Sequence, residues 1–192
     1  CDRRQRQMCI RDREITVEHL AEIFLNLQAQ GAHNINLVTP GQWQPWIIAA
    51  LDIARAKGLR LPIVCNTGGY ETVESVEAWR GYIDIWLADL KYVSSALSAE
   101  LSAAPDYFEV AAAAIDEMVR QVGAYQIGDD GLMRSGVILR HLVLPGQMEN
   151  TKRVIDYVSS HFPPKTVLFS LMSQYTPQSG STGALARRLN ER

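Results

Sequence analysis

The sequence has few cysteines, no long apolar run and no excess of charge of one sign. Its 192 residues include 3 cysteines, too few for the disulfide framework of a small secreted protein. No apolar run reaches the roughly 18 residues that a membrane-spanning helix needs. The 19 basic and 21 acidic residues nearly balance, which argues against a broad nucleic-acid-binding surface. With 47% hydrophobic residues the chain can bury one good core, so we expect a soluble, cytoplasmic, globular protein.

Residues 1–13 differ in composition from the rest. They contain five arginines and few apolar side chains, and they follow neither helical nor strand spacing. No apolar segment follows the basic start, so no secretory signal is predicted. We expect a disordered or non-native segment over 1–13, with a basic arm for an acidic partner as the alternative. One ordered domain should cover 14–178, followed by a tail over 179–192.

Helical and strand patterns alternate along the ordered part. Apolar residues at helical spacing mark segments at 16–30, 43–57, 72–79, 105–122 and 149–161. Short apolar runs typical of strands lie between or after them, at 35–38, 61–65, 83–88, 136–144 and 166–171. Two further stretches are expected to be irregular: 92–104, with one short helix, and the polar loop 124–135.

This alternation predicts an α/β protein with a parallel sheet buried on both faces. An open doubly wound sheet and a barrel both fit the pattern. A complete eight-stranded barrel takes about 250 residues, so a barrel requires this chain to be incomplete. Because the first ordered element is a helix, the first strand of such a barrel would be the missing one.

Every predicted strand is followed by polar residues. Ligands of parallel α/β folds bind at this carboxyl edge of the sheet. The residues there are Thr39, Asn66, Thr67, Asp89, Lys91, Arg140, His141, Ser173, Gln174 and Tyr175. Together they predict a site for a polar ligand that carries an anionic group.

Each of these residues also has a purely structural interpretation. Asp89 and Lys91 lie two positions apart, so they share one side of the strand and could simply pair with each other. Arg140 and His141 face opposite sides, so at most one of them contacts a ligand. The glycines that follow Thr67 could form only a turn, because no Walker or dinucleotide-binding glycine pattern is present.

Six segments in succession resemble the radical SAM superfamily, in particular the activating enzymes of glycyl radical enzymes (pyruvate formate-lyase activating enzyme-like proteins). They are GAHNINLVTP, IVCNTGGYETVE, GYIDIWLADLKY, APDYFEVA, GVILRHLVLPG and SLMSQYTP, within residues 14–178. The resemblance implies a partial (β/α) barrel with outer helices, S-adenosylmethionine (SAM) and a 4Fe-4S cluster that cleaves SAM to a 5'-deoxyadenosyl radical. It also implies an electron donor such as flavodoxin or ferredoxin, and either a glycyl radical-type protein substrate or a small molecule.

The resemblance assigns SAM-binding roles to residues at the strand ends. These are Thr39, Asn66, Thr67, Asp89, Lys91, Arg140 and Gln174. Arg140 matches an arginine that pairs with the SAM carboxylate, a role that suits a bidentate guanidinium. Asp89 and Lys91 match an Asp-Leu-Lys motif that helps to position SAM, and Asn66 stands where relatives have a carboxylate.

The cluster ligands are where this sequence departs from the family. Relatives bind the cluster through a CxxxCxxC loop after the first strand, whereas Cys1, Cys9 and Cys65 do not have that spacing. We assign none of them as a ligand, and we expect a fragment truncated at both ends and inactive on its own. Two alternatives are a non-catalytic SAM-binding barrel and a Schiff-base enzyme that uses Lys91, which Asp89 would disfavour by keeping the lysine protonated.

Overall fold

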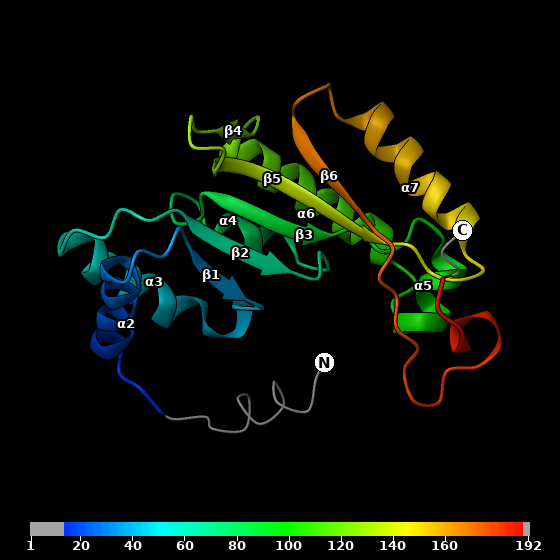
Figure 1. The fold of residues 1–192 in the computed structure, drawn as a ribbon, viewed down its shortest axis with the longest axis horizontal. Helices are drawn as coiled ribbons and strands as arrows, with labels where there is room; N and C mark the ends of the chain where they lie inside the picture. Colours follow the sequence, from blue (N-terminus) through cyan, green and yellow to red (C-terminus); the bar gives the residue numbers. More distant parts are fainter. Residues whose placement is uncertain (1–13, 190–192) are drawn as a thin grey trace.

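The computed structural model describes residues 14–189, which form an α/β fold with six α-helices and six strands (Figure 1). The strands are β1 (Ile35–Val38), β2 (Ile63–Thr67), β3 (Ile85–Asp89), β4 (Gln126–Ile127), β5 (Met133–Leu142) and β6 (Val167–Met172). The α-helices are α2 (Val17–Ala29), α3 (Gln44–Ala56), α4 (Val73–Glu77), α5 (Ser95–Ser102), α6 (Tyr107–Val122) and α7 (Met148–His161). Short 3-10 helices cover η1 (Gly41–Trp43) and η2 (Gly183–Ala186). The predicted alternation is confirmed, although strands β2 and β3 extend further towards the carboxyl end than predicted.

The sheet is mostly parallel, and its parallel strands follow one another in chain order. The order is β1, β2, β3, β5 and β6, with β4 added to β5 in the antiparallel direction. The register places Leu37 beside Cys65, Cys65 beside Trp86, and Trp86 beside Val137. Within residues 14–189 the sheet curves but does not close, since β1 pairs only with β2 and β6 only with β5 (Figure 1).

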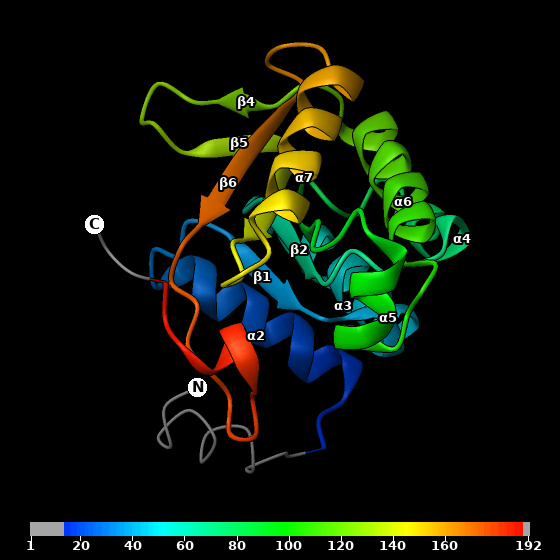
Figure 2. The same cartoon turned by 90° about the vertical axis from the view of Figure 1, so that its right-hand side faces the viewer.

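One face of the sheet holds the hydrophobic core. Core side chains of the strands, such as Leu37, Cys65 and Trp86, pack in one cluster with apolar side chains of α2, α3, α6 and α7. Helix α6 packs against β3 and β5, and α7 lies on the same side of the sheet as α6 (Figure 2). The alternating positions face the other way, where Val38 is 64% exposed and Asn66 is half-buried.

The prediction that both faces are buried holds only in part, because Val64 and Ile85 on the second face are 6% and 4% exposed whereas Val38 on the same face is 64% exposed. Strand side chains alternate between the two faces, and several polar side chains of the strands and strand ends share the second face, whereas His141 points into the helix layer. Asn36, Asn66, Asp89 and Arg140 all lie on that face, which the helices leave open. The open face is consequently where a ligand could reach the sheet.

The loop predicted over 124–135 is also corrected. Residues of β4 pair with the first part of β5 in a hairpin, whose turn uses Gly131 at φ 77° and is braced by the ion pair between Arg134 and Asp130. Both β4 residues are exposed, so this short edge strand carries no alternating apolar pattern that the sequence could reveal.

Local capping and strand contacts explain several element boundaries. The Thr16 hydroxyl accepts a hydrogen bond from the His19 N–H at 3.2 Å, which caps α2 as predicted. The Asp84 carboxylate accepts from the Ile63 N–H at 2.8 Å and joins the starts of β2 and β3. None of the helices in the described part is long and apolar enough to cross a membrane.

Candidate functional site

A polar cluster lies on the open face at the carboxyl ends of β2, β3 and β5. Asp89 and Arg140 are register partners, and Asp89 Oδ1 lies 2.7 Å from Arg140 Nη2 and 2.8 Å from Arg140 Nε. The same Nη2 donates to Asn66 Oδ1 at 2.8 Å, so the arginine spans three strands. Asp89 Oδ1 on one side and Asn66 Oδ1 on the other hold the guanidinium in place. The sequence prediction that these strand-end residues lie together is confirmed for these three.

Lys91 completes the cluster at the exit of β3. Its Nζ lies 3.9 Å from Asp89 Oδ2, and the side chain is 44% exposed. The side chains of Asp89 and Arg140 are 22% and 24% exposed, so solvent reaches the cluster. Two cationic groups face one carboxylate, and no hydrogen bond among residues 14–189 uses Arg140 Nη1. The arrangement can accept an anionic ligand group.

Thr39 lies beside the cluster and is held in an unusual backbone conformation. Its φ of 46° is in the left-handed region, which costs a residue with a side chain about 1–3 kcal/mol. Its N–H donates to the Asn66 carbonyl at 2.8 Å, which continues the β1–β2 pairing by one residue. Thr39 is therefore joined to the backbone of Asn66, and its side chain is exposed to solvent.

Thr67 and Gln174 do not join the cluster. Thr67 is 2% exposed on the helix-covered side of the sheet, where its hydroxyl donates to Glu71 Oε1 at 2.5 Å and accepts from the Gly69 N–H at 3.3 Å. Gln174 lies two residues beyond β6 and is exposed. No hydrogen bond or ion pair among the described residues joins Gln174 to Asp89 or Arg140. The neighbouring Ser173 is also exposed, while the Tyr175 hydroxyl donates to the Leu185 carbonyl at 2.9 Å.

His141 has a structural role, and the prediction that it and Arg140 face opposite sides is confirmed. Its side chain is 1% exposed among the helices. Its Nδ1 lies 2.7 Å from the Leu90 carbonyl, and its Nε2 lies 3.0 Å from Thr151 Oγ1 on α7. Burial lowers the pKa of His141, because the cationic form loses its hydration there.

This lowered pKa makes stability depend on pH. Below its ordinary pKa of 6.5 the unfolded chain takes up a proton at His141 that the folded protein resists. The contribution of His141 to stability is therefore fully present above that pKa and falls as the pH drops below it. We expect the urea-unfolding free energy to fall more steeply from about pH 7 to 5 in the wild type than in His141→Leu. An unchanged slope in His141→Leu would contradict this assignment.

The residues described here do not provide iron–sulfur ligands. Cys65, the cysteine within 14–189, is 2% exposed in the core, and burial raises its thiol pKa to about 12. A cluster needs several thiolate donors, whereas no group of three or more candidate metal ligands occurs within 14–189. The donor set of this part therefore does not fit a 4Fe-4S cluster. Cys1 and Cys9 lie outside the described residues, as does the predicted segment 1–13.

An apolar groove of about 1170 Å³ shares no residue with the polar cluster. It lies between the start of α2 and the start of α3, and its walls include Trp43 and Trp46, which are more than half exposed. The two indole rings meet edge to face with centroids 5.8 Å apart. Its walls carry one charged residue, Glu14, so the groove is a poorer match for an anionic ligand than the cluster is.

Sequence reasoning missed two side chains that contact the backbone of the cluster. Tyr107 on α6 and Asn150 on α7 are both nearly fully buried and both hydrogen bond to Lys91. Asn150 had a readable signal, because it stands four residues before Val154 and eight before Val158 on the buried stripe of α7. A polar residue on such a stripe has to satisfy its hydrogen bonds inside the protein. Tyr107 gave no comparable signal, since an aromatic residue is ordinary in a core.

No protein-family model matches the chain. One curated relative, the uncharacterized protein MJ0674 of Methanocaldococcus jannaschii, is 27% identical over 146 residues. The match covers 76% of this chain but 38% of that relative, so the chain spans well under half of the protein it resembles. The name of that relative assigns it no activity.

Proposed function

We propose that residues 14–189 are the SAM-binding part of a radical SAM enzyme that resembles the glycyl radical enzyme activases. The observation that carries the proposal is the cluster of Asn66, Asp89, Lys91 and Arg140 on the open face, at the carboxyl ends of neighbouring parallel strands. These are four of the seven residues that the motifs assign to SAM. Reductive cleavage of SAM would supply a 5'-deoxyadenosyl radical in the whole protein.

The strand order and the placement of the helices favour a partial barrel rather than a doubly wound sheet. In a doubly wound sheet the strand order reverses at a switch point, and helices cover both faces. Here the parallel strands follow chain order from β1 to β6, and the core helices pack on one face. That winding is the one a (β/α) barrel uses, with its ligand site at the carboxyl ends of the strands.

The cluster suits the amino acid moiety of SAM. Asp89 and Asn66 engage Nε and Nη2 of Arg140. Its Nη1 can therefore donate a hydrogen bond to the carboxylate of the ligand. Asp89 orients this guanidinium, and Lys91 adds a second positive charge. The cluster loop, the reductant of flavodoxin or ferredoxin type and a glycyl radical-type substrate belong to the proposal for the whole protein.

Titration calorimetry with SAM tests the proposal through an arginine variant. Arg140→Met removes a charge-assisted pair worth about 1.5–3 kcal/mol, so we expect its SAM affinity to fall about 10- to 100-fold. Arg134→Met removes an exposed arginine of the β4–β5 hairpin and should bind SAM like the wild type. Arg140→Lys keeps the positive charge but loses the planar guanidinium, so its SAM affinity should lie between those of the wild type and Arg140→Met.

Three results would decide between the alternatives. No SAM binding by the wild type, or equal binding by Arg140→Met, would refute the proposed site. SAM binding by a protein that takes up no cluster during anaerobic loading with iron and sulfide would favour the non-catalytic SAM-binding barrel. SAM binding with cluster uptake by the whole protein would favour the radical enzyme.

A further inference from the structure

Buried side chains hydrogen bond to both backbone groups of Lys91, its N–H and its carbonyl. Its N–H donates to the Tyr107 hydroxyl at 3.1 Å, and its carbonyl accepts from Asn150 Nδ2 at 3.0 Å. Tyr107 is the first residue of α6, whereas Asn150 lies in the first turn of α7. Two helices thus direct buried polar side chains at one residue of an otherwise irregular segment between β3 and α5.

The Tyr107 hydroxyl also joins the segments that follow β2 and β3. Its oxygen lies 2.9 Å from the Gly68 carbonyl oxygen and 2.8 Å from that of Asp89. One hydroxyl proton serves both carbonyls, while the oxygen accepts from the Lys91 N–H. Burial raises the pKa of Tyr107 well above its usual range, so the hydroxyl stays a neutral donor. The hydroxyl therefore links the carbonyls of Gly68 and Asp89 and the N–H of Lys91.

Asn150 fixes the residues that come next. Its Oδ1 accepts from the Val93 N–H at 2.9 Å and from the Ser94 N–H at 3.4 Å, while its Nδ2 donates to the Lys91 carbonyl. The side chain is 5% exposed. Each hydrogen-bonding edge of the amide is thus matched to the backbone groups it meets, and neither leucine nor aspartate could replace all three contacts.

We propose that Tyr107 and Asn150 are positioning residues that set the place of the Lys91 side chain in the polar cluster. That the ligand is SAM rests on the proposed function, whereas the positioning of Lys91 does not depend on it. With its N–H and carbonyl both held, Lys91 keeps its Nζ 3.9 Å from Asp89 and directly over Gly68, where an added Cβ would lie 3.5 Å from Nζ. Both side chains are nearly fully buried, and both act through the backbone of Lys91.

Amide hydrogen exchange measured by NMR tests the positioning without any ligand. In Tyr107→Phe we expect exchange of the Lys91 amide to accelerate about tenfold, the effect of losing one typical hydrogen bond. Asn150→Leu should accelerate exchange of the Val93 amide in the same way. Tyr92→Phe is the matched control, because Tyr92 is buried in the same small hydrophobic cluster as Tyr107 but its hydroxyl contacts Ser102 instead.

A double-mutant cycle in SAM binding separates positioning from general destabilisation. We expect Tyr107→Phe to weaken SAM binding about fivefold in the wild-type background and to have no further effect in Lys91→Met, because the tyrosine acts through that lysine. Unchanged exchange at Lys91, equal acceleration in Tyr92→Phe, or equal losses of affinity in both backgrounds would overturn the inference. If the wild type binds no SAM, the proposed function fails, and the exchange measurement alone then decides whether the residues position Lys91.

Discussion

Replacing Gly69 with alanine is expected to destabilise the protein by roughly 3 kcal/mol or more. A Cβ at this position would lie 2.1 Å from the Asp89 carbonyl oxygen, a backbone atom that cannot move aside alone. Gly69 also has a φ of 80°, which side-chain-bearing residues adopt at a cost of about 1–2 kcal/mol. The glycine therefore allows the segment after β2 to approach β3 closely enough for both to reach the Tyr107 hydroxyl.

Gly81→Ala separates the two causes. Gly81 has the same φ of 80°, but a Cβ there would meet nothing within 4 Å. Urea unfolding of Gly81→Ala should therefore show only the conformational cost of about 1–2 kcal/mol. Equal losses of unfolding free energy in the two variants would mean that the close approach of Gly69 to Asp89 is not a significant constraint.

The order of helices and strands could be predicted because local patterns determine it. Thr16 marks a helix start through its own hydroxyl, and apolar side chains at helical spacing mark each long helix. The burial of the second face was predicted only partly correctly, although Asn36 within one apolar run and Asn66 and Asp89 directly after two others carried the information. Polar side chains on one face of a strand indicate that this face is open to solvent, and short strands contain few such positions.

Part of the site could be predicted, and the limit is physical. Parallel strands bring their carboxyl ends to one edge, so Asp89 and Arg140 could be placed together although 51 positions separate them. Gln174 lies beyond the end of its strand, where no register constrains it. Tyr107 and Asn150 reach the site from the helix layer, and which helix residue meets a given loop depends on packing that no local pattern encodes.

Two residues with positive φ lie at the edge of the sheet where the polar cluster lies, and others, such as Ala103 and Lys165, lie elsewhere. Thr39 at φ 46° follows β1, and Gly69 at φ 80° follows β2, both within reach of the backbones of Asn66 and Asp89. A folded protein tolerates such conformations where the surrounding contacts enforce them, and they concentrate at ligand sites. Among these two, Thr39 is the strained residue, because glycine adopts a positive φ freely.

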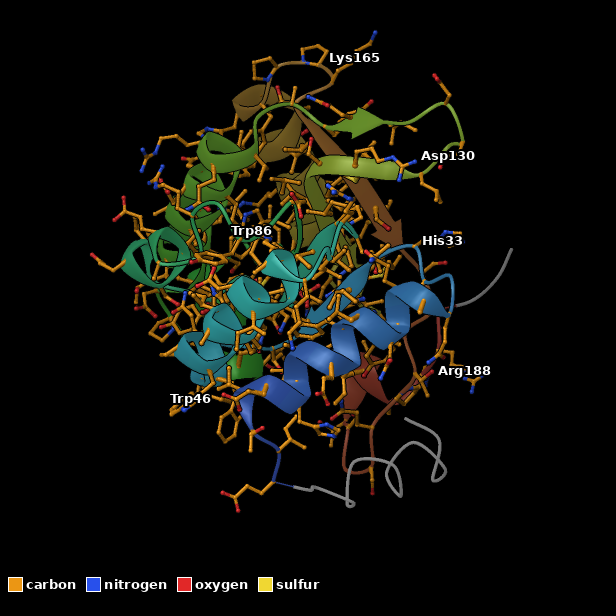
Figure 3. The ribbon with its side chains drawn as sticks, turned by 90° about the vertical axis from the view of Figure 1, so that its left-hand side faces the viewer. His33, Trp46, Trp86, Asp130, Lys165 and Arg188 are labelled. Atoms are coloured by element: carbon orange, nitrogen blue, oxygen red, sulfur yellow. The ribbon has the colours of Figure 1, made fainter. Side chains whose placement is uncertain are left out.

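The core on the opposite face should dominate global stability, with Trp86 at its centre. Trp86 is 1% exposed, and Figure 3 shows it inside the ribbon whereas Trp46 lies at the periphery. Trp86→Ala should lower the free energy of unfolding by about 3–5 kcal/mol, because it removes a large buried side chain and leaves a cavity. Trp46→Ala, at a side chain that is 54% exposed, should cost about 1 kcal/mol or less.

Trp86→Phe tests a finer feature of the same site. The indole Nε1 is buried without a hydrogen-bond partner among the described residues, and an unsatisfied buried donor costs about 1–3 kcal/mol. Phenylalanine removes that donor while it keeps most of the apolar contact. We therefore expect Trp86→Phe to lose less than half of what Trp86→Ala loses in urea unfolding. A phenylalanine variant as unstable as the alanine variant would show instead that the indole N–H is satisfied in the folded protein and contributes to its stability.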